Sequence, residues 1–271
     1  MMSSIQFGRW PGGRTHAVTF SYDDGRKEDR RMVEIFNRYG LKGTFNLNSD
    51  MLNLQDRVSP DEVRTLYAGH EVACHFATHR FPTRCPREIL LREVLEDRRR
   101  LETLTGGLVT GMAYPFGLFN AEVIEILRAC GIHYARAAVS TGQFTWAPND
   151  WLQWHPTGHD RSVTPDTIRR FFNAPVWEAA GRLYYIFGHS YEFNSPERWA
   201  FLESICQAFR DQGSDNLWAA TNLEIMTYVE AVRALVFSVA CDRVRNPSAI
   251  PVWIDKDGKA VEIPAGQMLS L

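Results

Sequence analysis

The chain has 271 residues, enough for one large domain or two small ones, and a chain of this length can bury a full core without disulfides. Its net charge of −2 removes the usual reason to propose nucleic acid or an anionic membrane as a partner. The five cysteines are scattered and include no Cys-x-x-Cys pair, which argues against a disulfide framework. We find no signal peptide, so the chain as given is expected to be cytoplasmic, or secreted if a leader has been removed.

Apolar and β-branched runs alternate with longer amphipathic segments along most of the chain. Strands are predicted at residues 16–22, 43–48, 70–75, 111–115, 133–138, 151–155, 182–189 and 217–220. Helices are predicted at residues 27–39, 60–68, 86–104, 121–130, 164–172, 195–212 and 223–235. This β-α alternation favours an α/β fold with a parallel sheet, either open or closed into a barrel.

Two segments add detail to this pattern. The long charged helix at residues 86–104 is expected to bury one apolar stripe, made of Leu90, Leu91, Val94, Leu95, Leu101 and Leu104. Residues 237–271 carry strand signals with Asp257-Gly258 as a hairpin turn. We therefore expect one main α/β unit over residues 1–236 and a small C-terminal β appendage over residues 237–271.

Polar side chains follow four of the predicted strands at the point where each strand ends. They are Asp23 and Asp24 after the first strand, His75 and His79 after the third, Tyr114-Pro115-Phe116-Gly117 at the fourth, and His189 after the long late strand. Each group alone is ordinary, because acids and glycine make turns and single histidines are often structural. The carboxyl ends of parallel strands meet at one edge of a sheet, where ligands bind. Together these residues predict one site.

The residue types at this edge indicate a metal centre. Two neutral imidazoles and one carboxylate, from His75, His79 and Asp24, suit Zn²⁺, with Co²⁺, Ni²⁺ or Mn²⁺ as alternatives. Three protein ligands leave a coordination position open for water, which is typical of a catalytic site. A cation held there would lower the pKa of water and polarise a carbonyl, so the chemistry predicted is hydrolysis.

The remaining strand-end groups fit the other roles of such a hydrolase. Asp23 is free to act as the base if its neighbour Asp24 binds the metal, since adjacent residues do not easily face one cation in the same way. His189 could protonate a leaving amine. The backbone N–H of Phe116 could stabilise a tetrahedral oxyanion.

The motifs in this order resemble those of the polysaccharide deacetylases, the NodB-like carbohydrate esterases of family 4. The resemblance covers residues 14–230 and rests on TFSYDDG (19–25), GHEVACHFATH (69–79), AYPFG (113–117) and YYIFGHS (184–190). It implies a distorted (β/α) barrel with seven strands and the removal of N- or O-acetyl groups from an acetylated carbohydrate. It also implies the roles given above to Asp23, Asp24, His75, His79 and His189.

The chain departs from the family pattern in two places. Ala113 stands where the third motif has an arginine that steadies the base, and Arg136 is the expected substitute. In the fourth motif, at residues 150–160, Trp154 is expected to wall the acyl pocket and His159 or Asp160 to orient a catalytic group, although a core tryptophan and surface histidines explain the sequence equally well. The other residues expected to bind substrate are Tyr114, Pro115 and Tyr191.

Three other functions are compatible with parts of this pattern. Two histidines and a carboxylate also form the iron site of Fe(II) oxygenases, but those sites lie on double-sheet β folds. An amide or cyclic-amide hydrolase acting on a small metabolite could use the same barrel. A carbohydrate-binding protein without catalysis would not need both a base and an acid. The sequence does not determine the acyl substrate, the metal or the oligomeric state.

Overall fold

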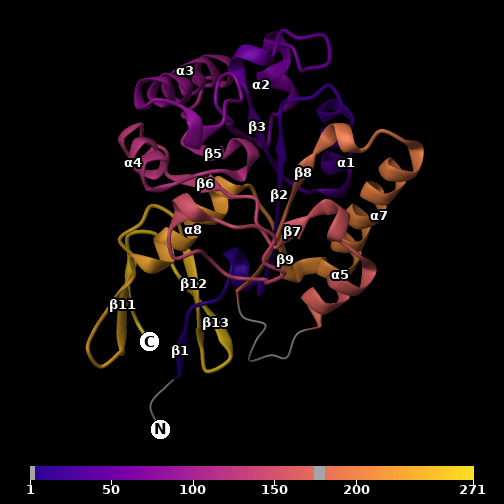
Figure 1. The fold of residues 1–271 in the computed structure, drawn as a ribbon. Coiled ribbons are helices and arrows are strands. Elements are labelled where there is room, and N and C mark those ends of the chain that lie inside the picture. Colours follow the sequence, from indigo (N-terminus) through magenta and orange to yellow (C-terminus); the bar gives the residue numbers. More distant parts are fainter. Residues whose placement is uncertain (1–3, 174–180) are drawn as a thin grey trace.

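The computed structural model describes residues 4–173 and 181–271 (Figure 1). Its strands are β1 (Ile5–Gln6), β2 (His16–Asp23), β3 (Gly43–Leu47), β4 (Glu71–Cys74), β5 (Gly111–Ala113), β6 (Tyr134–Arg136), β7 (Gly158–His159), β8 (Arg182–His189), β9 (Leu217–Ala219), β10 (Val236–Phe237), β11 (Arg243–Arg245), β12 (Val252–Lys256), β13 (Lys259–Ile263) and β14 (Met268–Ser270). Its α-helices are α1 (Asp29–Tyr39), α2 (Val63–Leu66), α3 (Arg87–Thr105), α4 (Ala121–Ala129), α5 (Pro165–Phe172), α7 (Pro196–Gly213) and α8 (Asn222–Arg233).

The main sheet is parallel and has the strand order β6-β5-β4-β3-β2-β8-β7. This path of seven strands confirms the predicted α/β barrel-like fold. Strand β9 adds to it by pairing with the first half of β2, below the point where β3 begins to pair. All eight residues of β2 are buried, because neighbours flank it on both sides and helices cover the sheet. The carboxyl end of this central strand therefore lies in the middle of the sheet edge at which the site is predicted.

The segment from Trp154 to His159 joins the two edges of the curled sheet. Trp154 makes a parallel bridge to Arg136 beside β6, and Gly158-His159 pair with β8. The strand predicted at residues 151–155 is wrong, because a 3-10 turn occupies Trp151–Gln153. The Asp150 side chain caps this turn by accepting a hydrogen bond from the Leu152 N–H at 3.0 Å, so the backbone curls before it reaches the sheet.

Helix α3 buries most of the predicted apolar stripe, but not all of it. Leu90, Val94 and Leu101 are buried as expected, but Leu95 is 48% exposed. Two acids, Glu93 and Asp97, are buried in its place. Buried acids are rare unless their oxygens are satisfied, so these two point to a local demand for acceptors.

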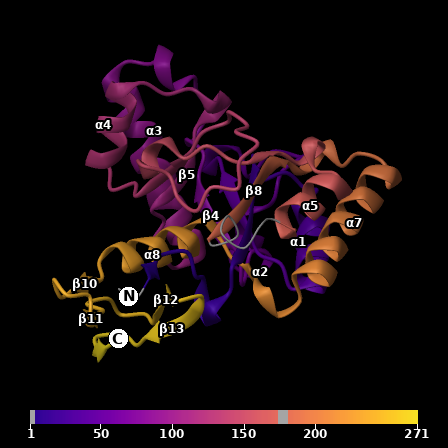
Figure 2. The same cartoon turned by 90° about the horizontal axis from the view of Figure 1, so that it is seen from below.

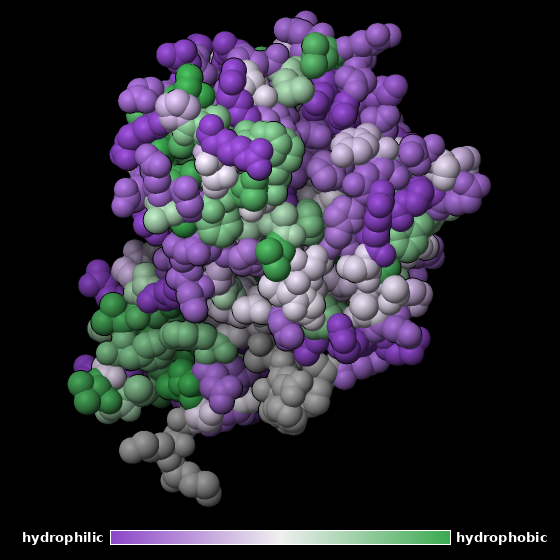
Figure 3. All heavy atoms as spheres, in the orientation of Figure 1, coloured by the Kyte–Doolittle hydropathy of each residue, from purple (hydrophilic) through white to green (hydrophobic). Residues whose placement is uncertain are grey.

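The C-terminal residues form two small antiparallel sheets, β10-β11-β14 and β1-β12-β13, the second of which includes the N-terminal strand. Asp257 and Gly258 both have positive φ and turn the β12–β13 hairpin, as the sequence predicts. Figures 1 and 2 both show these strands beside α8, with the two chain ends nearby. Hydrophobic side chains gather on this part of the surface (Figure 3). Among the residues that the structure describes, no helix is long and apolar enough to cross a membrane.

Candidate metal centre and active site

The two adjacent acids at the end of β2 point in different directions. Asp23 is the last residue of the strand, and Asp24 leaves it with a φ of 85°, which few residues other than glycine adopt. The Asp24 N–H donates to the Asn46 carbonyl at 2.9 Å, and Arg57 contacts the Asp24 carbonyl oxygen. This turn separates the two carboxylates, so that Asp23 faces Arg136 while Asp24 faces His79.

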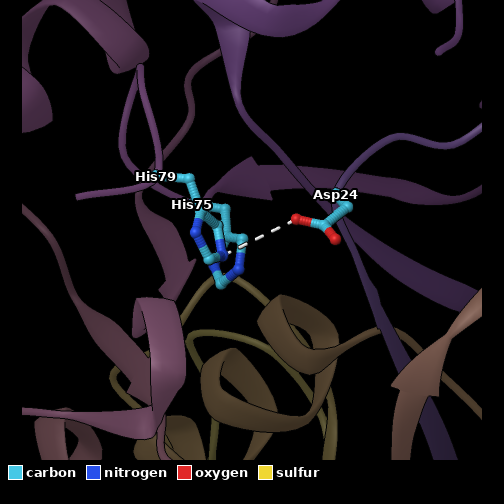
Figure 4. Close-up of side chains that lie close together, drawn as sticks. All are labelled: Asp24, His75 and His79. Carbon is cyan, nitrogen blue, oxygen red and sulfur yellow. Dashed lines mark ion pairs between the residues drawn. The ribbon is translucent and has the colours of Figure 1, made fainter. Parts of the chain in front are cut away.

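Asp24, His75 and His79 converge, although they come from the ends of β2 and β4 and the loop after β4. Figure 4 shows both imidazole rings turned toward the Asp24 carboxylate. The ligand atoms of the three side chains all lie within 4.8 Å of one another, and the His79 Nε2 is 3.7 Å from the Asp24 Oδ1. The sequence-predicted set is thus brought together in one place.

The state of His75 fits metal binding. Its ring is buried, and Nδ1 lies 2.8 Å from the Ala113 carbonyl oxygen, which can only accept a hydrogen bond. Nδ1 therefore carries the proton, and the Nε2 lone pair is free to bind a cation. Burial lowers the pKa of His75 to about 4, so the imidazole is neutral at pH 7. One neutral imidazole of this kind, a second imidazole and a carboxylate are a donor set that suits Zn²⁺ and similar ions.

Asp23 is a buried carboxylate surrounded by donors and cationic groups. Arg136 contacts its Oδ2 from β6, the Asn46 Nδ2 donates to its Oδ1 at 2.8 Å, and the His189 Nε2 lies 4.0 Å from Oδ2. Burial favours the protonated acid, but the charge of Arg136, together with the nearby His75 and His189 rings, outweighs it and holds the pKa of Asp23 below its ordinary value. Asp23 is therefore a carboxylate at neutral pH, the form that can accept a proton.

His189 ends β8 and lies across Asp23 from the two metal-ligand candidates. Its Nδ1 is 3.2 Å from the Glu192 Oε1, which leaves Nε2 directed at Asp23. The Glu192 Oε2 lies 3.5 Å from the His159 Nε2 and 3.0 Å from the Arg161 Nε. His159 is thus linked to His189 through Glu192.

The turn after β5 forms the opposite wall of the site. Pro115 is buried, and Phe116 has a φ of 58°, which turns its ring outward. The Phe116 ring is 49% exposed and stacks on Phe81 with centroids 3.8 Å apart, and its other neighbour is the His79 ring at 4.6 Å. Two stacked aromatic rings therefore extend outward from a metal-ligand candidate.

These residues enclose a cavity of about 340 Å³. Its lining comprises Asp23, Asp24, His75, His79, Tyr114, Phe116, Gly117, Arg136, Ala138, Phe187, His189 and Tyr191. Tyr191 is 38% exposed beside His189, where a substrate can reach it. Trp154, predicted to wall the acyl pocket, instead packs against Tyr134 and Tyr185 in the core and lines a different cavity.

Some residues that shape the site were missed by sequence reasoning. Asn46 lies on β3 beside Asp23, and Asp97 lies on α3 within 2.9 Å of the His75 backbone nitrogen. The signal for Asn46 was present, because Asn46 and Asn48 interrupt an otherwise apolar strand end at alternate positions. The sequence carries no such signal for Asp97, because acids are frequent on the exposed face of a charged helix.

Residues 11–135 match the family model described as polysaccharide deacetylase. This stretch, a little under half of the chain, is therefore similar to the polysaccharide deacetylases. The resemblance drawn from the motifs is confirmed by this match. It spans the segments that carry Asp23, Asp24, His75 and His79, as well as the turn at Phe116. A comparison with curated protein sequences finds no match.

Solved structures share the fold at low sequence identity. A Mycobacterium smegmatis protein assigned to the polysaccharide deacetylases has a TM-score of 0.61 and 17% identity over 85% of this chain and 96% of its own. A family 4 carbohydrate esterase from Streptomyces lividans, in complex with acetate, has a TM-score of 0.54 and 16% identity over 76% of this chain and 93% of its own. The Xyl-CE4 domain of a multidomain xylanase from the hindgut metagenome of Trinervitermes trinervoides has a TM-score of 0.53 and 16% identity. That match covers 79% of this chain and 91% of the Xyl-CE4 domain.

Proposed function

We propose that this polysaccharide deacetylase relative removes acetyl groups from an N- or O-acetylated carbohydrate, with Asp24, His75 and His79 holding a divalent cation, most simply Zn²⁺. The observation that carries the proposal is the convergence of these three ligands within 4.8 Å, beside a buried carboxylate that Arg136 keeps ionised. When bound there, the cation would polarise the acyl carbonyl and favour ionisation of water.

The side chains around the cavity supply the proton transfers. Asp23 accepts a proton from the water that attacks the acyl carbon, which yields a tetrahedral oxyanion. The backbone N–H of Phe116 donates to that oxyanion, since Phe116 lines the cavity directly after a proline. The C–N or C–O bond then breaks, and the His189 Nε2 gives its proton to the leaving amine or alcohol. The products are acetate and a free amino or hydroxyl group on the sugar.

The assay that tests the proposal measures acetate release from chito-oligosaccharides, acetylated xylan and N-acetylglucosamine, with and without a chelator. We expect release from at least one carbohydrate, loss of release with chelator, and recovery when Zn²⁺ is restored. The Asp24→Ala variant serves as the control that Zn²⁺ should not rescue. Chelator-resistant release, or no release from any acetylated sugar, would contradict the proposal.

A small amide or cyclic amide is the second candidate substrate. Phe116 lines the cavity, and its ring stacks on Phe81 outside it, which gives an apolar surface that suits a compact acyl group as well as a sugar face. The two substrates share the site and its chemistry but differ in what surrounds the scissile bond. Hydrolysis of small cyclic amides together with inert acetylated sugars would favour this second candidate.

A further inference from the structure

The loop that carries both histidine ligands has a strained backbone. It runs from His75 at the end of β4 to residue 80, and both Phe76 (φ 59°) and His79 (φ 56°) adopt the left-handed conformation. Residues with a side chain seldom adopt this conformation, at a cost of order 1 kcal/mol or more each. A loop with two such residues keeps its shape only where the surrounding structure holds it.

Asp97 on α3 holds the start of this loop. Its side chain is fully buried, and its Oδ1 accepts a hydrogen bond from the Ser49 N–H at 2.9 Å. Its Oδ2 accepts one at 2.9 Å from the His75 N–H, which it shares with the Leu47 carbonyl at 3.0 Å. Both carboxylate oxygens are thus committed to backbone donors. The contact fixes the backbone of a metal-ligand candidate without touching its imidazole ring.

Glu93, one helical turn earlier on α3, holds the far end. Its Oε2 accepts from the Thr78 N–H at 2.8 Å, and its Oε1 accepts from the Thr78 hydroxyl at 2.6 Å. Its own carbonyl accepts from the Ala77 N–H at 3.3 Å, and the Arg80 Nε lies 3.1 Å from Oε1. The residue directly before His79 is therefore anchored at its backbone and at its side chain.

We propose that Glu93 and Asp97 are positioning residues for the metal centre, which hold the 75–79 loop in its metal-binding shape before a cation arrives. The inference rests on the proposed function, because it takes His75 and His79 as ligands. Glu93 and Asp97 are four residues apart, so both carboxylates lie on one face of α3. One rigid helix therefore fixes both ends of the loop. Such preorganisation raises metal affinity, since binding then orders less of the chain.

A purely structural role predicts something different. If the two acids only complete the core, their loss should lower the stability of the metal-free protein and leave the affinity of the folded protein for zinc unchanged. If they position the ligands, zinc affinity falls in protein that is still folded. Glu96 lies on the same helix between them, with a side chain that is 40% exposed and paired with Arg99, so it offers a matched control.

The experiment is a chelator-competition titration with Zn²⁺ on the full chain, with folding checked by circular dichroism of the metal-free protein. We expect Glu93→Ala and Asp97→Asn each to weaken zinc binding about tenfold, and Glu96→Gln to match the wild type. Asparagine places an NH₂ group against a backbone N–H, so it cannot replace Asp97 fully. Glu93→Gln keeps an acceptor for the Thr78 N–H and should retain most of the affinity.

A second variant keeps the test valid if Glu93→Ala does not fold. Thr78 is exposed, and Thr78→Ala removes the hydroxyl that Glu93 holds and a methyl group but keeps the backbone contact, so we expect a smaller loss of about threefold. Wild-type zinc affinity in folded Asp97→Asn and Thr78→Ala would overturn the positioning role while leaving the proposed function intact. A wild-type protein that binds no zinc would overturn both.

Discussion

The Arg136 guanidinium on β6 contacts the Asp23 carboxylate on β2 from across the curled sheet, and both side chains are almost fully buried. Ala113, where relatives carry the motif arginine, lies on β5 next to β6, and the two residues pair in register. Arg136 thus brings a positive charge to Asp23 from the strand next to the one that carries Ala113. This contact agrees with the expectation that Arg136 supplies the missing charge.

Removal of the Arg136 guanidinium should disable Asp23 as the proposed base. Arg136→Ala leaves Asp23 buried without its main counter-charge, so burial would dominate and favour the protonated acid, which cannot accept a proton. We expect turnover to fall at least about 100-fold while zinc content stays near that of the wild type. Acetate release and metal analysis on the same preparation measure both. Arg128→Ala, which breaks the exposed Arg128–Asp150 pair, is the matched control, and normal turnover in Arg136→Ala would refute the assignment.

Substitutions at the two adjacent acids should separate metal binding from catalysis. Asp24→Ala and His75→Ala each remove a proposed ligand, and we expect both to lose bound zinc. Asp23→Asn keeps the size of the side chain and removes its basicity, so it should retain zinc and lose activity by roughly 10² to 10⁴. Inductively coupled plasma analysis gives the metal content. Active Asp23→Asn protein, or zinc loss in that variant alone, would show that the two roles are assigned the wrong way round.

The exposed aromatic pair should act on large substrates more than on small ones. A pyranose ring presents a face of C–H groups that can pack on an exposed phenyl ring, and Phe81 lies one ring farther from His79 than Phe116. We expect Phe81→Ala to raise KM for an acetylated oligosaccharide about five- to tenfold, equivalent to about 1 kcal/mol of lost contact. KM for 4-nitrophenyl acetate should not change. Phe7→Ala, at an exposed phenylalanine distant in sequence from Phe81, is the control. Equal effects of Phe81→Ala on the KM of both substrates would contradict a sugar-binding role.

Much of this architecture was accessible from the sequence, for physical reasons that can be located. The β-α alternation predicts the order of the elements. Because parallel strands present their carboxyl ends at one edge of the sheet, the sequence also predicts that Asp24, His75 and His79 lie close together. The residues that were missed have another character. Glu93 and Asp97 are buried because they accept hydrogen bonds from a loop, and helical periodicity cannot register a need for acceptors that arises 15 to 22 residues away.

Trp154 illustrates a different limit. Its segment reads as a strand because tryptophan and leucine favour sheets, but Asp150 caps a turn there and only Trp154 itself reaches the neighbouring β6. From a sequence alone, an aromatic residue near a site motif fits the pocket wall and the core equally well. The packing against Tyr134 and Tyr185 places it in the core.

The contribution of the buried acid Glu71 to folding stability should decline between pH 5 and pH 8. Burial raises the pKa of Glu71 to about 7, although its oxygens accept hydrogen bonds from Thr44 (2.8 Å), Tyr134 (2.7 Å) and the Leu223 N–H (2.9 Å). The folded state therefore holds a proton that the unfolded chain releases near pH 4.5. The stabilising contribution is complete below pH 4.5 and is lost as the pH rises through 7.

Glu71→Gln should flatten this dependence. Glutamine mimics the protonated acid, because its carbonyl oxygen can accept from Thr44 and Leu223 while its NH₂ group donates to the Tyr134 hydroxyl. The difference in pKa corresponds to about 3 kcal/mol between pH 5 and pH 8, so the variant should lose less stability than the wild type over that range by an amount of this order. Urea unfolding at both pH values measures it. Glu122→Gln, exposed on α4, should keep the wild-type slope, and an unchanged slope in Glu71→Gln would mean that Glu71 is ionised in the folded protein throughout.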